Sequence, residues 1–443
     1  MAWPAGFSRI IRSNAAGLVI ALALAGFLAV QALAAFPYQN GIDFYQFWGV
    51  PVAKRLSGTG ETPYVDPPAY ARVLNALADA SESRKLREAN RQRRAIEPMG
   101  TPFLYASFAA FAGEFERAQA FFVILQYLAA GAAVYMLARL RDVARWPAAW
   151  IALLVELTFT PFLQDVRVGN VNSMQLLVVA ALLHVALRRL YSGHALIGGL
   201  FVGVLAVFVV FKPNTPWIAL AFAIHYAVVM GARRFLVGAG LAALLGALAV
   251  GVGAWYFGGA HAWAQWLAYA RGMDGSGLAL TIDQGNLSLP MLLARLSHAY
   301  GPMGFGLVLA AALAVALLLA ASAGGRRSEL AAPTLRAAFA DPWFAASLGV
   351  VFTFATSPLL WPHYLVFALV PIFWLARIDG AARMGAAGAA LCYGLLSLPL
   401  ISLLAASGLY GGIQAAMVFS WVALLPGVFA YVAHRNRALQ AAA

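Results

Sequence analysis

The chain has 443 residues, of which 63% are hydrophobic and only 11% are charged, and its mean hydropathy is +0.78. A soluble domain carries about 25% charged residues, so the composition excludes an ordinary soluble protein and predicts an all-α polytopic membrane protein. The net charge of +13 does not require a nucleic-acid partner, because most basic residues fall in short clusters between apolar runs. The single cysteine, Cys392, excludes an intrachain disulfide.

About 12 apolar runs are predicted to be transmembrane helices, since about 20 apolar residues cross the bilayer. The first follows the basic stretch SRIIRSN and has no small-residue cleavage site, so we expect a retained helix and not a signal peptide. The predicted spans cover residues 15–36, 118–138, 147–163, 173–187, 195–211, 215–230, 235–257, 303–322, 343–360, 364–377, 384–403 and 413–432.

Alternate connections carry clusters of arginine, among them RLRDVARW, LRRLYSGH, GARRF and the tail AHRNRALQ. Because basic flanks remain in the cytoplasm, both termini are predicted to be cytoplasmic. Arginine greatly outnumbers lysine, and alanine and glycine are abundant. This bias indicates a GC-rich bacterial genome, so the predicted location is the bacterial inner (plasma) membrane.

The chain is predicted to be a single integral-membrane domain, residues 1–443, with two periplasmic segments. The first segment, 37–117, carries a basic helix over 81–94, expected to be solvated or interfacial, with headgroup binding as the alternative. It also carries the short apolar run 101–112, expected to lie at the outer surface or to dip partway into the membrane. The second segment, 258–302, is rich in tryptophan and tyrosine, which is typical of interface anchoring.

Polar groups gather at the predicted outer ends of the helices, where such residues are costly and tend to be functional. Together they predict an anion site with one base, facing outward. The candidates are Asp43, Tyr45 and Trp48 after the first helix, Asp165, Arg167, Asn170 and Asn172 after the third, Lys212 in VFKPNTP, Asp283, Asn286, Ser288 and Arg295 before the eighth, and Ser357, Trp361, His363 and Tyr364 after the ninth.

Each candidate has a plainer interpretation. Asp43 and the two asparagines can cap helices, and Lys212 can snorkel from a helix end. His363 can be a satisfied core histidine, and Arg167 and Arg295 can pair with Asp165 or with lipid phosphates. Glu156, in the middle of a predicted span, is expected to have a structural partner, His184 or His225; in a proton-coupled transporter it has a larger role.

The ordered motifs across about 40–370 resemble glycosyltransferase family 87, the polyprenyl-phosphate-mannose-dependent mannosyltransferase-like proteins of the GT-C superfamily. VRVGNVNSMQLL is similar to that family's G-Q-x-N-x-L-L element, FKPNTP to its K-P turn, and DQGNLSLPMLLARL to its N-Q-S-L…L-x-R element. SPLLWPHYLV is similar to its S-P-x-x-W-x-H element, and GTPFLYASFAAF to a Y-P-P-L segment. Asn170 and Leu287 stand where the family pattern has glutamine, and the first loop is enlarged.

The resemblance implies a GT-C-like fold and a hexosyltransferase that moves a sugar, mannose by default, from a polyprenyl-phosphate donor to a glycolipid or glycan acceptor on the periplasmic face. The expected reaction inverts the anomeric centre and needs neither a metal nor another cofactor. Asp43 is the expected base, and His363, the second catalytic residue, is expected to stabilise the leaving phosphate together with Lys212. Lys212, Arg295 and Arg167 are expected to bind the donor phosphate. Asn170, Asn172, Asn286, Ser288, Trp361, Tyr45 and Trp48 are the expected substrate contacts.

Three other functions remain open from the residues alone. Twelve helices with cytoplasmic termini suit a transporter or lipid flippase, although no clear internal repeat is present. An O-antigen ligase or polymerase also uses lipid-linked glycans at the outer face, but from a pyrophosphate donor. A non-enzymatic assembly scaffold is the third, and only the polar cluster disfavours it.

Overall fold

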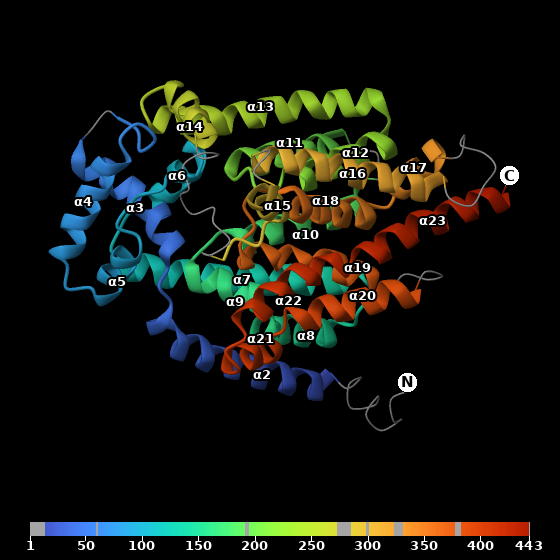
Figure 1. The fold of residues 1–443 in the computed structure, drawn as a ribbon, viewed down its shortest axis with the longest axis horizontal. Helices are drawn as coiled ribbons and strands as arrows, with labels where there is room; N and C mark the ends of the chain where they lie inside the picture. The colour runs from blue at the N-terminus through green and yellow to red at the C-terminus, as the bar shows by residue number, and fades with distance from the viewer. Residues whose placement is uncertain are drawn as a thin grey trace.

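The computed structural model describes residues 14–58, 61–190, 195–272, 285–297, 301–322, 331–376 and 382–442. Asp283, one of the polar candidates, lies outside these residues. The described residues form a body of packed helices, with the helices of the first loop at one end (Figure 1). The start of α2 and the end of α23 lie at the opposite end of the body.

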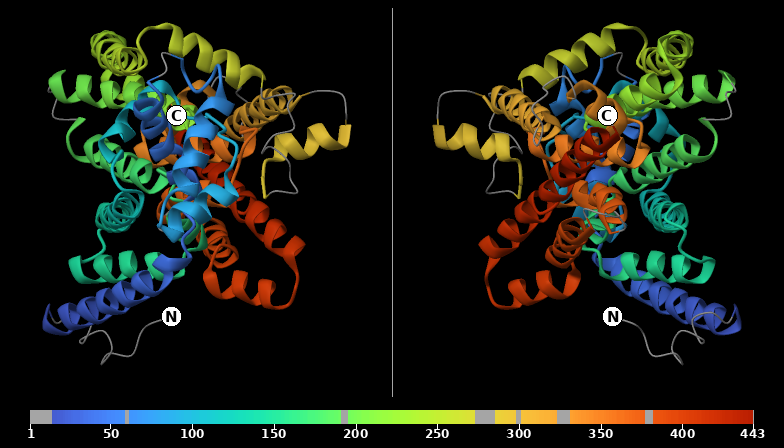
Figure 2. Two further views of the ribbon diagram at one scale, coloured as in Figure 1. Left: turned by 90° about the vertical axis from the view of Figure 1, so that its left-hand side faces the viewer. Right: turned by 90° about the vertical axis from the view of Figure 1, so that its right-hand side faces the viewer.

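The body contains α2 (Asn14–Ala35), α7 (Phe115–Leu140), α8 (Arg145–Thr158), α9 (Thr160–Val168), α10 (Asn172–Arg188), α11 (Ala195–Phe211), α12 (Pro216–Met230), α13 (Ala232–Tyr256), α16 (Pro302–Ser322), α17 (Ala331–Phe339), α18 (Pro342–Thr356), η7 (Pro362–Ala368), α19 (Leu369–Leu375), α20 (Ala382–Leu395), α21 (Leu398–Ala406), α22 (Tyr410–Val422) and α23 (Leu425–Ala442). Viewed from the ends, α2 leaves the body on one side and α21 and α22 on the other (Figure 2).

Five helical segments in the described part of the chain are long and apolar enough to cross a membrane. The helices α17 and α18 pass the same test together but are bent by 98°. Six further apolar helices are shorter, at 10–17 residues. The protein is therefore a multi-pass membrane protein, as predicted, while the count of 12 spans stays a prediction. The five long segments are Gly17–Tyr38, Phe115–Leu140, Arg233–Tyr256, Pro302–Ser322 and Tyr410–Ala442.

Several of the predicted spans are divided into two helices, and two of these lie in contact. Residues 147–163 form α8 and α9, which meet at Phe159, and residues 384–403 form α20 and α21. Proline stands in the first turn of both α9 and α21. Because proline has no N–H and a fixed φ, it is tolerated where a helix begins but interrupts a helix that would run through it. The two breaks join each other, because the Thr160 N–H donates to the Leu396 carbonyl at 3.0 Å.

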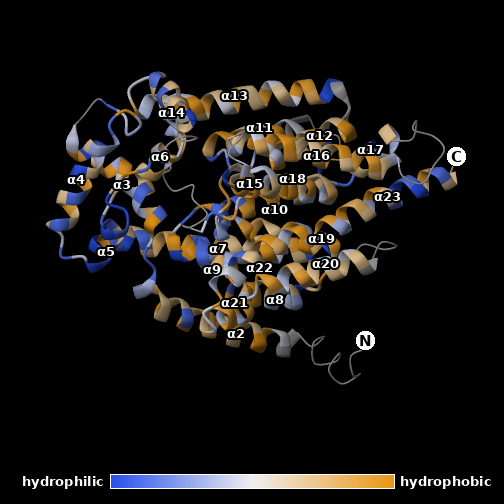
Figure 3. Cartoon of the chain, in the orientation of Figure 1, coloured by the Kyte–Doolittle hydropathy of each residue, from blue (hydrophilic) through white to orange (hydrophobic). Residues whose placement is uncertain are grey.

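The first loop builds a small core of its own from aromatic residues. It consists of α3, α4, α5 and α6 with two short 3₁₀ turns, and hydrophilic residues are concentrated in its helices (Figure 3). Phe44, at the start of α3, lies in the middle of this core and packs against four other phenylalanine rings. The bounds are η1 (Phe36–Tyr38), α3 (Ile42–Ser57), α4 (Pro67–Asp79), α5 (Arg84–Gln92), α6 (Pro102–Phe108) and η2 (Ala109–Phe111).

The short apolar run 101–112 is helical, as α6 and η2, and it packs against α3 and α13. A Cβ added to Gly253 of α13 would lie 2.8 Å from the backbone nitrogen of Phe103, so the glycine allows this close approach. The second segment contains α14 (His261–Gly272), which lies over the loop, and α15 (Leu289–Ser297).

Glu156 is buried in α8, but its expected histidine partners were wrong. Its carboxyl lies against Gly131 of α7, where an added Cβ would be 2.8 Å from Oε1. The Nδ1 atom of His225 instead lies 2.8 Å from the Phe339 carbonyl oxygen, and His184 is exposed. No ion pair joins Glu156 to either histidine in the described residues.

Candidate functional site

Asp43 stands at the start of α3, where the first loop touches the body. Two glycines with positive φ allow this contact. Gly41 (φ 57°) donates its N–H to the Arg167 carbonyl at 2.9 Å, and Gly169 (φ 71°) ends α9. A Cβ at Gly169 would lie 2.5 Å from the Cβ of Phe44, so only glycine lets α3 approach this closely. The carboxylate of Asp43 is thereby placed beside the segment that follows α9.

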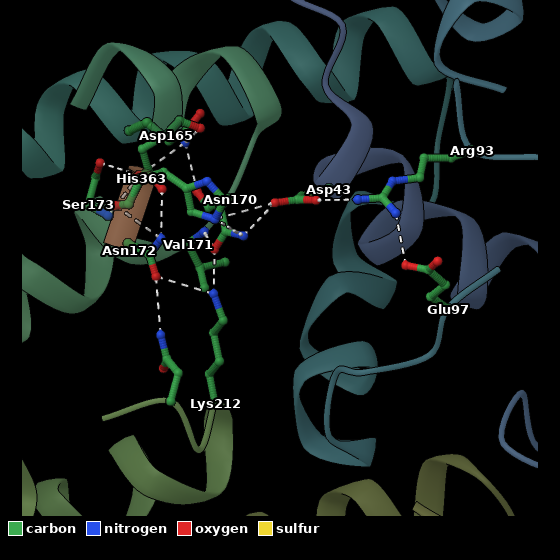
Figure 4. Close-up of polar contacts among 12 residues, drawn as sticks. Asp43, Arg93, Glu97, Asp165, Asn170, Val171, Asn172, Ser173, Lys212 and His363 are labelled. Atoms are coloured by element: carbon green, nitrogen blue, oxygen red, sulfur yellow. Dashed lines mark hydrogen bonds and ion pairs between the residues drawn. The ribbon is translucent and has the colours of Figure 1, made fainter. Parts of the chain in front are cut away.

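Asn170 bridges Asp43 to a buried lysine (Figure 4). Its Nδ2 donates to Asp43 Oδ2 at 2.6 Å, while its Oδ1 accepts from Lys212 Nζ at 2.5 Å and from the Val171 N–H at 2.7 Å. The donors around Oδ1 and the acceptor beside Nδ2 fix which way the amide points. A carboxylate and an ammonium thus share one amide, which keeps them close without direct contact.

Asn172 gives Lys212 its second partner, and Asp165 holds Asn172 in place. Lys212 Nζ donates to Asn172 Oδ1 at 3.2 Å, and Asn172 Nδ2 donates to Asp165 Oδ1 at 3.0 Å. The other oxygen of Asp165 accepts from the N–H and the hydroxyl of Ser173, so this buried acid anchors the start of α10. The prediction that Asp165 pairs with Arg167 was wrong, because these contacts occupy the carboxylate.

Lys212 is 9% exposed, in the turn between α11 and α12. Burial lowers the pKa of its ammonium below the ordinary lysine range, because loss of hydration penalises the charge, while the carboxylates of Asp43 and Asp165 oppose that shift. The ammonium also lies 4.8 Å from the centre of the Tyr364 ring. A buried cation of this kind is ready to receive an anionic ligand.

His363, at the start of η7, completes the group around Asp43. Its Nε2 lies 3.7 Å from Asp43 Oδ2 and 3.3 Å from Asn170 Nδ2. Because an amide nitrogen can only donate, the imidazole nitrogen accepts in that contact. Its backbone carbonyl accepts from Asn172 Nδ2 at 3.4 Å, which ties η7 to α10.

Arg93 is a neighbour of Asp43 that the sequence did not single out. Arg93 directly follows α5, the helix formed by the basic stretch of the first loop. Its guanidinium lies 3.7 Å from Asp43 Oδ1 and 2.8 Å from Glu97 Oε2. The three side chains are 22%, 16% and 16% exposed, so this side of the acid faces partly toward solvent (Figure 4). Within a run of arginines, no spacing distinguishes Arg93 from its neighbours.

The remaining candidates lie around this cluster and not inside it. Asn286 and Ser288 bind the backbone of the turn before η7, through the carbonyls of Pro358 and Ser357. Tyr45 and Trp48 are buried in the core of the first loop, where they donate to Asn90 and to the Gly113 carbonyl. Arg167 and Arg295 are exposed, Trp361 is half-buried, and the hydroxyl of Ser357 donates within the turn, to the Leu359 carbonyl.

The site therefore combines one partly exposed carboxylate, a neutral imidazole acceptor, two ordered amides and a buried ammonium, in a multi-pass helical membrane protein. Such a set can take a proton from a hydroxyl and neutralise a phosphate at the same centre. The arrangement is that of a group-transfer enzyme acting at a membrane.

The chain belongs to glycosyltransferase family 87, because that family's model matches residues 98–358. The match includes Asn170, Asn172 and Lys212, and Asp43, Arg93 and His363 lie outside it. Comparisons with curated proteins and with solved structures gave no match. Membership confirms the resemblance drawn from the motifs and makes the protein a membrane glycosyltransferase.

Proposed function

We propose that this glycosyltransferase moves a hexose, with mannose as the first candidate, from a polyprenyl-phosphate donor to a hydroxyl of a glycolipid or glycan. We place the reaction at the periplasmic face of a bacterial inner membrane, with both termini in the cytoplasm. The observation that carries the proposal is the bridge made by Asn170, which holds a carboxylate and a buried ammonium on its two ends. A base for the acceptor and a cation for the leaving phosphate are then adjacent.

Asp43 is the proposed base. An acceptor hydroxyl is a weak nucleophile and needs a base within hydrogen-bond reach. As the acceptor oxygen forms its bond to the anomeric carbon, Asp43 takes the hydroxyl proton, and the bond between that carbon and the phosphate oxygen breaks. The attack comes from the face opposite the phosphate, so the configuration inverts. His363 Nε2 accepts from Asn170 Nδ2 at 3.3 Å, so His363 is proposed to hold the amide that lies beside Asp43 and not to act as a cation for the phosphate.

Lys212 is the proposed partner of the leaving phosphate. Fixed charges and donors directed at developing negative charge supply much of the rate in such reactions. The ammonium is already desolvated and held by two amide oxygens, so little reorganisation is needed when an anion arrives. A leaving phosphate with Lys212 beside it needs no metal for neutralisation, and we expect a chelator to leave the rate unchanged.

The outer candidates have lesser proposed roles. Arg167 and Arg295 are exposed and suited to lipid or substrate phosphate, and the half-buried Trp361 is suited to stacking on a sugar face. Asn172 is proposed to act through Lys212, whose ammonium its amide oxygen holds, and Asn286 and Ser288 to act by shaping the turn that carries His363. Tyr45 and Trp48 already use their polar atoms within the loop core, so we give them a supporting role.

The test is sugar transfer by purified protein in lipid, with labelled prenyl-phosphate sugars and a bacterial glycolipid extract. We expect labelled acceptor, free prenyl phosphate in equal amount and an inverted linkage, unchanged by a chelator. A panel of prenyl-phosphate and prenyl-pyrophosphate sugars separates this activity from that of a ligase. Release of label across sealed vesicles without transfer would identify a transporter and contradict the proposal.

A further inference from the structure

An apolar cavity of about 240 Å³ lies between α10 and α11, on the side of the body next to the polar cluster. On each helix its lining residues recur every three or four positions, so each helix offers one continuous face. The lining consists of Met174, Gln175 and Val178 from α10, and Val204, Val207, Phe208 and Phe211 from α11.

The packing of α11 explains why this space exists. Its glycine face is taken by α13, because a Cβ on Gly199 or Gly203 would lie 2.9 Å or 2.4 Å from a leucine side chain of that helix. Small residues let two helices in a membrane approach closely. The approach draws α11 toward α13 and leaves its valine and phenylalanine face unfilled toward α10. Val204 is 39% exposed, so the cavity is open at its side.

One end of the cavity meets the proposed phosphate site. Phe211, in the lining, directly precedes Lys212 in the chain. Gln175, also in the lining, donates to Asn214 Oδ1 at 3.3 Å, and Asn214 donates to the same Asn172 oxygen that Lys212 binds. Gln175 and Phe211 thus connect one end of the apolar space to the cation and its amides.

The other end extends along the helices, away from the cation. Asn172 begins α10 and Phe211 ends α11, so Val178 and Val204 both lie further from the cluster. Seven residues of helix separate Val204 from Phe211, a distance of about 10 Å at 1.5 Å per residue. A cation at one end of an apolar path that runs parallel to the helices is complementary to a membrane lipid phosphate.

We propose that this cavity holds the first isoprene units of the donor, with the donor phosphate on Lys212. The inference rests on the proposed function and adds to it where the lipid binds. Lys212 at the mouth favours a chain attached to a phosphate over an acyl chain of a neutral lipid.

The experiment measures how KM for the donor depends on its chain length, with donors of one isoprene unit and of three or more. Val204→Trp and, separately, Val178→Trp fill the cavity from its two walls. Leu248→Trp is the matched control, because Leu248 of α13 is 56% exposed and lies outside the lining. The rate with the one-unit donor shows in each variant that the folded catalytic site is intact.

In the wild type and in the control, we expect KM to fall as the chain lengthens. In each filled variant, KM for the long donor should rise about tenfold, because contacts with a few methylene groups are lost, while KM for the one-unit donor stays the same. An unchanged chain-length dependence in both filled variants would overturn the inference and leave the proposed function standing. A rise in KM for the acceptor lipid alone would assign the cavity to an acceptor chain and also overturn it. If the wild type accepts no prenyl-phosphate sugar, whatever the chain length, the proposed function itself is wrong.

Discussion

The two oxygens of Asp43 face two different regions of the molecule. Oδ2 faces the body, where Asn170 donates to it at 2.6 Å and where the partners of Asn170 are themselves buried and hydrogen-bonded. Oδ1 faces the first loop, where Arg93 lies at 3.7 Å and the side chains are partly exposed. The body side is ordered in advance for the chemistry, whereas the loop side is a longer, wetter ion pair that contributes less.

Among the substitutions on the body side of Asp43, Lys212→Met should reduce kcat most. The leaving phosphate loses its nearest cation, and we expect kcat to fall about 10²- to 10³-fold, as for removal of one fixed transition-state donor. Lys54→Met is the matched control, because Lys54 lies over the rings of Tyr256 and Phe257, away from the cluster. Equal effects in the two variants would contradict the assigned role.

Lys212 also predicts a pH dependence with a definite sign. Burial lowers the pKa of its ammonium, so kcat/KM, which reports the free enzyme, should fall as pH rises through a value below the ordinary lysine range. Lys212→Arg keeps its charge at every accessible pH and should move this alkaline limb upward. An alkaline limb at the same pH in both proteins would assign it to another group.

Asn170→Asp should have the next largest effect. It places a second carboxylate at the 2.6 Å contact with Asp43, and like charges at this distance cannot both ionise easily. We expect kcat/KM to fall about 10²-fold, in the range found for misplaced general bases. Asn170→Gln keeps both amide functions and should retain more activity than Asn170→Asp. Asn75→Asp in α4 controls for the added charge.

Arg93→Gln tests the loop side and should have a smaller effect. We expect a loss of about fivefold in kcat/KM at neutral pH, the scale of one exposed ion pair at about 1 kcal/mol. Arg93→Lys keeps a cation near Asp43 and should retain more of the rate than Arg93→Gln. Arg91→Gln, exposed in α5 just before Arg93, should leave the rate unchanged. A loss of stability in Arg93→Gln with the rate per folded molecule unchanged would make Arg93 merely structural.

Tyr45→Phe should change the rate least and the stability most clearly. The Tyr45 hydroxyl donates to Asn90 Oδ1 at 2.8 Å inside the loop core, and its loss leaves a buried acceptor that costs about 1–3 kcal/mol. The melting temperature in detergent should therefore drop, while the rate per folded molecule stays within twofold of wild type. A large loss of rate at unchanged stability would indicate instead that Tyr45 contacts the substrate.

The sequence predicted the convergence on Asp43 better than it predicted the helices. Asn170, Asn172, Lys212 and His363 could be grouped because each is a polar residue at a predicted outer end of a helix, where burying a polar group is costly. Arg93 could not be found in this way, since an arginine in a basic run looks the same whether it faces solvent or a carboxylate. Its position depends on how the first loop folds onto the body, through contacts far apart in the chain.

The broken spans were missed for a related reason. Hydropathy over 147–163 and 384–403 is continuous, and the prolines at 161 and 399 are compatible with either a kink or a break. The choice is made by contact between the two segments, where the Thr160 N–H donates to the Leu396 carbonyl. The short helix α9 that follows this break carries Asp165 to the start of α10 and leads into Asn170 beside Asp43, so the irregular part of the fold is the part that forms the site.

The most direct test of the central claim compares Asp43→Asn with wild type. Both purified proteins, matched in lipid and in melting temperature, are supplied with a labelled prenyl-phosphate sugar and the acceptor extract. Asparagine keeps the shape of the side chain but cannot take a proton, so we predict a loss of at least about 10³-fold in the rate of transfer with donor binding retained. Transfer by Asp43→Asn at the wild-type rate would show that Asp43 is not the base and would contradict the account.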